Sequence, residues 1–140
     1  MKRAISILVV LAVFISTMAL PAQGAQIPDV TPQYLYTDDY SVLLTISENG
    51  TATIHLFLKA LPTVTEIRCE TQLERKISDK WYPIYIGTTP ARWEYTTTSR
   101  FVSQEYTAQL SSNGTYRVVA RITFISSTVE AIALTSQATY

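Results

Sequence analysis

Residues 42–60 read VLLTISENGTATIHLFLKA, two runs of alternating side chains on either side of Asn49-Gly50. The second run has apolar residues at every other position: Ala52, Ile54, Leu56, Leu58 and Ala60. A period of two places alternate side chains on opposite faces of a β-strand. Asn-Gly between two such runs is a strong hairpin signal, for a tight turn with positive φ at both residues. The stretch therefore predicts an antiparallel hairpin with one face in the core.

Further β-prone runs follow at short intervals along the chain. They cover residues 65–75, 81–86, 92–98, 102–110, 116–124 and 128–136. Pro83 falls inside the run at 81–86, and because proline has no N–H to donate, we expect an edge strand or a bulged strand there. Seven or eight short strands separated by turn signals predict an all-β fold, an antiparallel β-sandwich.

Asn113-Gly114-Thr115-Tyr116 puts a tyrosine at the start of a late strand, directly after a glycine turn. In immunoglobulin-like sandwiches, a tyrosine in this place donates its hydroxyl back to upstream backbone, an arrangement called the tyrosine corner. The alternative is an ordinary hairpin with a core tyrosine. Trp81 opens a middle strand after a turn and is predicted to be the central core aromatic. Together these features favour an immunoglobulin-like sandwich.

The N-terminus has the pattern of a secretory signal peptide. Lys2-Arg3 precedes an apolar run from Ala4 to Leu20, and small residues follow as far as Ala25. This pattern predicts a helical signal peptide at 1–25, an extended leader at 26–39 and the β-sandwich domain at 40–140, with cleavage after Gly24 or Ala25. We expect a secreted, extracellular protein that has no membrane attachment after cleavage.

The charge balance indicates which partners the chain suits. The full sequence has 11 basic and 11 acidic side chains, and loss of Lys2 and Arg3 with the signal peptide lowers the net charge to about −2. A nucleic-acid binder needs a basic stripe to neutralise phosphates. We therefore expect no nucleic-acid partner.

Few residues combine into a catalytic or metal-binding set. Cys69 and His55 are the single cysteine and histidine, so an internal disulfide or a usual zinc site cannot form. Alternation around Cys69 favours a small buried hydrophobe over a reactive thiol or an intermolecular bridge. Glu66, Glu70 and Glu74 alternate on the opposite face, which is typical of a solubilising sheet surface. We expect no metal, no cofactor and no enzymatic activity.

Five aromatic residues fall within one short segment: Trp81, Tyr82, Tyr85, Trp93 and Tyr95. Planar rings on a sheet face stack against sugar rings or a partner's aromatic surface, so this cluster is the candidate binding region. The alternative is packing, with Trp81 and an isoleucine or Tyr85 in the core and Trp93 and Tyr95 covering a sheet edge.

Several short motifs spread over the mature chain occur together. They are Pro32 ahead of an aromatic pair, Leu44-Thr45-Ile46, Asn49-Gly50-Thr51-Ala52, Gln72-Leu73-Glu74-Arg75-Lys76, Trp81, Gly114-Thr115-Tyr116-Arg117-Val118, Glu130, Thr135-Ser136 and Tyr140. The set resembles a group of small exported proteins of clostridia and related Gram-positive bacteria, classed as a domain of unknown function. The resemblance implies a single secreted β-sandwich and brings no assigned activity. Members often carry a cysteine in the second strand, where this chain has Ile54.

The sequence thus predicts a secreted, non-enzymatic binding or surface-interaction module whose partner is a glycan or a protein at the cell exterior. Two alternatives belong to other classes. One is a small secreted glycan hydrolase that uses Glu66, Glu70 or Glu94, which requires two carboxylates facing a shared concavity. The other is a self-associating structural protein of the cell surface, with edge strands that pair between chains.

Overall fold

The computed structural model describes residues 34–140, so the predicted signal peptide and most of the predicted leader lie outside the described residues. The described part forms ten strands and no helix. The strands are β1 Thr37–Ile46, β2 Thr51–Ala60, β3 Glu66–Ile77, β4 Lys80–Pro83, β5 Tyr85–Ile86, β6 Thr89–Pro90, β7 Arg92–Thr97, β8 Phe101–Gln109, β9 Thr115–Ile125 and β10 Val129–Thr139. The first strand therefore begins slightly before the predicted domain boundary at Tyr40.

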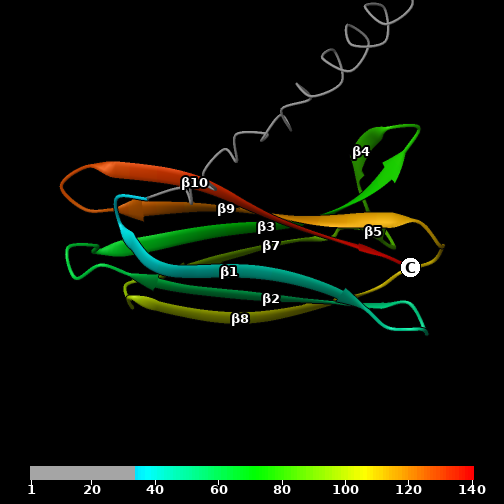
Figure 1. The fold of residues 1–140 in the computed structure, drawn as a ribbon, viewed down its shortest axis with the longest axis horizontal. Coiled ribbons are helices and arrows are strands. Elements are labelled where there is room, and N and C mark those ends of the chain that lie inside the picture. The colour runs from blue at the N-terminus through cyan, green and yellow to red at the C-terminus, as the bar shows by residue number, and fades with distance from the viewer. Residues whose placement is uncertain (1–33) are drawn as a thin grey trace, which may run out of the picture. The chain divides into compact units, whose positions relative to one another are not determined.

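The strands form two main antiparallel sheets that face each other, with β5 and β6 as a separate short ribbon (Figure 1). One sheet has the order β1-β2-β8, and the other has the order β10-β9-β3, with β4 and β7 both pairing with β3. Leaving out the short strands β4 to β6, the first, second and fifth strands oppose the third, fourth, sixth and seventh. In the constant-type immunoglobulin sandwich the fourth strand lies in the sheet of the first, second and fifth, so β7 is the one strand placed differently here. The predicted antiparallel β-sandwich of immunoglobulin-like type is confirmed, and its described part has ten strands where seven or eight were predicted.

The core lies between the two sheets, where alternation places apolar side chains. On β2, Ile54, Leu56 and Leu58 are fully buried, whereas His55 between them is exposed. They face the inward side chains of β9, which include Tyr116 and Phe124. Removing this apolar surface from water is the main stabilising contribution to such a domain.

The β1–β2 turn differs from the predicted one. Gly50 has φ +80°, but Asn49 has no positive φ, and the Gly50 N–H donates to the Ser47 carbonyl at 2.9 Å. The Asn49 side chain instead accepts a hydrogen bond from the Thr51 N–H, at 3.2 Å. The connection is thus a three-residue loop, Glu48-Asn49-Gly50, in place of the predicted two-residue turn. The Asn49 side-chain amide competes with backbone carbonyls for the nearby N–H donors.

The tight two-residue turn occurs elsewhere. Ser78 and Asp79 have φ values of 46° and 65° and connect β3 to β4, where Ile77 pairs with Lys80. Positive φ at both central residues is what a two-residue hairpin turn with the right-handed twist of its strands requires. The sequence predicts a polar turn through Ser78-Asp79-Lys80 between these strands, and the structure confirms a turn there. Neither central residue is a glycine or asparagine, so its two-residue geometry has no Asn-Gly signal.

Trp81 was predicted as the central core aromatic, and this is wrong. It lies on β4 opposite Lys76, on the outer face of the sheet, with the guanidinium carbon of Arg117 4.5 Å from its ring centroid. The register explains the difference, because directly paired residues share a face. Leu73 points inward, so Lys76 and its partner Trp81 point outward, and the large core aromatics are Tyr116 and Phe124.

The predicted strand at 81–86 is divided at Ile84. β4 ends at Pro83 and pairs with β3, and β5 pairs with β6 in a separate ribbon. Between them, the Ile84 N–H donates to the Leu73 carbonyl at 3.1 Å, and the Ile84 side chain packs against the core. The position of Pro83 in an edge strand is confirmed, since a proline there removes no hydrogen bond from the sheet interior.

Tyr116 forms the predicted tyrosine corner. Its side chain is buried, and its hydroxyl donates to the Ser112 carbonyl at 2.5 Å. The bond spans four residues and holds the connection between β8 of one sheet and β9 of the other. The ordinary-hairpin alternative does not apply, because β8 and β9 belong to different sheets.

We expect Tyr116→Phe to lower the free energy of unfolding by about 1 kcal/mol, since it removes this hydrogen bond without changing the ring. Tyr106→Phe is a matched control, because the Tyr106 hydroxyl is buried and no described residue forms a hydrogen bond with it. We expect the Tyr106→Phe control to leave the free energy of unfolding unchanged or to raise it. Urea denaturation of both variants is the measurement, and equal losses would contradict the assignment.

Gly50 lies against the C-terminal residue as well as in a turn. A Cβ built there would come 2.8 Å from Cζ of Tyr140, whose backbone pairs with Gly114 through two hydrogen bonds of 2.9 and 3.0 Å. The glycine is therefore needed both for its φ and for the close approach of the Tyr140 ring.

We expect Gly50→Ala to cost about 1 kcal/mol more than Gly87→Ala, because a Cβ at position 50 displaces Tyr140. Gly87 also has a positive φ, of 65°, but a Cβ there meets nothing within 4 Å. Chemical denaturation measures both variants. In a Tyr140→Ala background the two substitutions should cost the same, and a persistent difference would contradict this explanation.

Candidate binding site

The structure separates the five aromatic residues of the predicted binding region. Tyr82 and Tyr85 are exposed, at 46% and 62% of their surface, and line one pocket. Trp81 lies on the outer face of the sheet, where its ring stacks against the Arg117 guanidinium. Trp93 and Tyr95 are half-buried on β7 and pack against the core, as in the packing alternative for these two residues.

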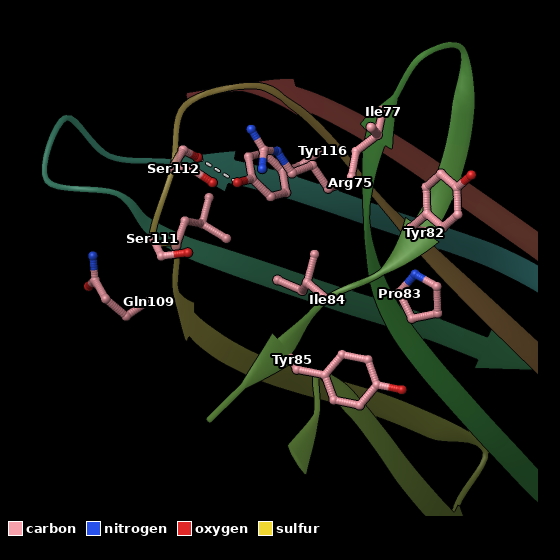
Figure 2. Close-up of a pocket in the computed structure, with 11 residues that line it drawn as sticks. Arg75, Ile77, Tyr82, Pro83, Ile84, Tyr85, Gln109, Ser111, Ser112 and Tyr116 are labelled. Carbon is pink, nitrogen blue, oxygen red and sulfur yellow. Dashed lines mark hydrogen bonds between the residues drawn. The ribbon is translucent and has the colours of Figure 1, made fainter. Parts of the chain in front are cut away.

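The pocket containing Tyr82 and Tyr85 has a volume of about 210 Å³ and opens at one end of the sandwich (Figure 2). Its walls come from three segments that are far apart in the sequence. They are Arg75 and Ile77 of β3, Tyr82–Tyr85, and Gln109–Ser112 with Tyr116. The sequence pattern indicated only the middle segment, since the other two reach the pocket through strand pairing.

Backbone geometry holds each wall in place. Tyr82 pairs with Arg75 across β4 and β3, so both side chains point to the pocket side. The hydrogen bond from the Ile84 N–H to the Leu73 carbonyl fixes the chain between Tyr82 and Tyr85. On the opposite wall, the Tyr116 hydroxyl holds the Ser112 carbonyl. The pocket is therefore formed by residues that the fold already orders.

Arg75 is the charged residue of this pocket. Its Nη2 donates to the Asn113 carbonyl at 2.7 Å, and its guanidinium carbon lies 5.9 Å from the ring centroid of Tyr116. Its Nε is buried and has no hydrogen-bond partner among residues 34–140. Arg75 has no carboxylate within ion-pair distance among the described residues, and no Asp or Glu lines the pocket.

The glutamates named for the hydrolase alternative lie on the outer face of the five-stranded sheet. Glu70 binds Arg92 at 2.6 Å and Arg121 at 3.1 Å, and the same Arg92 nitrogen binds Glu94 at 2.8 Å. Glu66 pairs with Arg68 at 2.5 Å. Each carboxylate is thus partnered by an arginine on a solvent-facing surface, as predicted for a solubilising face.

Glu74 differs from the other glutamates of this face. Only 8% of its surface is exposed, and its Oε2 accepts a hydrogen bond from Arg117 Nε at 2.7 Å. Trp81 covers Arg117 from the other side. A buried carboxylate needs such a partner, because an unpaired buried charge is strongly destabilising. Alternation alone predicts that Glu74 is exposed like Glu66 and Glu70. It cannot predict that Trp81 packs on Arg117 and so helps to bury the Glu74–Arg117 pair.

Cys69 is buried on the inner face of β3, as the alternation predicted. Burial raises the pKa of its thiol from 9.0 to about 11, because the thiolate is poorly solvated there. His55 is exposed, with its Nδ1 3.4 Å from a Glu105 carboxylate oxygen. Within residues 34–140, no three His, Cys, Asp or Glu side chains come close enough together to hold a metal ion.

Comparison with known proteins adds no assignment: no protein-family model and no curated protein matches this chain. The resemblance to the clostridial group therefore stays a prediction. The part of the chain that the structure describes has no helix that is long and apolar enough to cross a membrane.

We expect the Cys69 thiol of the folded protein to react at least about 100-fold more slowly with Ellman's reagent at pH 8 than in the unfolded chain. A pKa higher by two units lowers the thiolate fraction by about this factor, and burial adds a steric barrier. The same shift removes stability as the pH rises from about 9 towards 11, since the unfolded chain ionises first. Fast labelling without denaturant would show an accessible, reactive thiol instead.

Proposed function

We propose that this protein is a secreted, non-enzymatic binding module that holds a glycan at the cell exterior through the pocket beside Tyr82 and Tyr85. The observation that carries the proposal is two exposed tyrosine rings at the rim of a pocket whose opposite wall is polar. Aromatic faces exposed in this way suit the apolar faces of sugar rings.

The polar wall supplies hydrogen-bonding groups for sugar hydroxyls. Ser111 and Ser112 line the pocket, and neither hydroxyl makes a hydrogen bond within the described residues. The volume of about 210 Å³ lies below the roughly 300–1,000 Å³ typical of drug-sized ligands. It therefore suits one sugar ring, with the rest of a glycan lying outside.

This proposal narrows the contact region predicted from sequence. Tyr82 and Tyr85 remain in it, whereas Trp81 covers the Glu74–Arg117 pair, and Trp93 stacks on Tyr106 with ring centroids 5.1 Å apart. Rings already engaged in packing offer less free surface to a ligand. Export is proposed from the basic and apolar pattern of residues 1–25.

We expect Tyr82→Ala and Tyr85→Ala each to weaken glycan binding by about tenfold, as loss of an aromatic contact does. Glycan arrays and pull-down with purified cell walls are the measurements. Phe101→Ala is the control, because Phe101 is an exposed aromatic on the outer face of the other sheet. If the Tyr82→Ala/Tyr85→Ala double variant keeps all binding of the unsubstituted protein, the pocket is not the site.

A further inference from the structure

We infer that the pocket selects an acidic sugar, one that carries a carboxylate, with Arg75 as the residue that recognises its charge. The inference rests on the proposed glycan-binding function and adds the chemical class of the ligand. It is carried by the juxtaposition, in one pocket, of two exposed tyrosine rings and an arginine that has no carboxylate partner among residues 34–140.

The charge balance around Arg75 is the first step. The other arginines of the large sheet, Arg68, Arg92, Arg117 and Arg121, each bind a glutamate. Arg75 lies on the inner side of β3 and is half-buried, and its one hydrogen-bond partner within residues 34–140 is a neutral carbonyl. A partly desolvated guanidinium without a counter-charge attracts an anion more strongly than one in open water.

Arg75 lies where a ligand in the pocket can contact its charge. Figure 2 shows Arg75 beside Tyr116 at one end of the pocket, with Ile84 between it and Tyr85. The contact with Tyr116 and the bond to the Asn113 carbonyl hold the guanidinium there. Carboxylates are bound well by a planar guanidinium, because its N–H donors match carboxylate oxygens. In Arg75, Nε is buried and Nη2 donates to Asn113, so a ligand carboxylate is bound through the remaining N–H donors.

The remaining lining favours a sugar over a peptide carboxylate. Peptide-binding modules generally hold an extended segment along a groove or a sheet edge. This pocket instead has ring-sized volume, free hydroxyls of Ser111 and Ser112, and the ring of Tyr82 at its rim. A sugar ring with several hydroxyls matches these three features, and one carboxylate on that ring matches Arg75. Uronic, sialic and muramic acids have both kinds of group.

The test is a glycan array that pairs uronic-, sialic- and muramic-acid glycans with their neutral or methyl-esterified counterparts, followed by calorimetric titration of the best pair. We expect the acidic form to bind about tenfold or more tightly, with affinity falling as salt rises. Arg75→Gln should remove this preference, and Arg75→Lys should keep part of it. Arg100→Gln is the control, because Arg100 is exposed and lies away from the pocket lining.

Thermal unfolding of each variant shows whether loss of the Arg75 contacts has changed the fold, and Arg75→Lys provides a second variant if Arg75→Gln fails to fold. Equal binding of acidic and neutral glycans that still depends on Tyr82 would overturn the acidic-sugar inference and leave the proposed function standing. Absence of any Tyr82-dependent glycan binding would remove both. Tighter, Arg75-dependent binding of a peptide with a free C-terminal carboxylate than of its amide and of every glycan would overturn the sugar class.

Discussion

The hydrogen bond from the Tyr116 hydroxyl to the Ser112 carbonyl joins the two halves of this structure. It holds the segment where the chain passes from β8 of one sheet to β9 of the other. The buried ring belongs to the core, while the carbonyl it binds belongs to the wall of the pocket. Arg75 lies against the same ring and bonds to the next residue, Asn113. Core packing and the candidate binding site thus depend on one side chain.

The two faces of the large sheet use charge differently. On the outer face, alternating glutamates and arginines partner one another, and the most buried of these pairs, Glu74 with Arg117, is covered by Trp81. Such pairs are locally neutral and leave little unbalanced charge for a partner. On the inner face, Arg75 has no carboxylate within ion-pair distance in the part of the chain that the structure describes. This contrast is the reason that we place selectivity for an anion in the pocket.

Much of the fold could be predicted because period-two alternation is a local property. The hairpin of β1 and β2, the edge position of Pro83, the burial of Cys69 and the tyrosine corner all follow from neighbours in sequence. The candidate site was predicted less well. Tyr82 and Tyr85 were named, but the residues facing them, Arg75 and the β8–β9 connection, carry no sequence signal of a site.

Sequence by itself determined the long strands and which side chains share a face of each, because the pleat alternates regardless of what the strand packs against. It did not determine the division of the 81–86 run at Ile84 or the short strand β6. The tertiary structure decided which strands are neighbours and therefore which faces meet. Pairing across β3 and β4 turned Trp81 outward over Arg117 and brought Tyr82 beside Arg75. Pairing and register join residues distant in the chain, and no local pattern encodes them when several strands of similar length and composition compete.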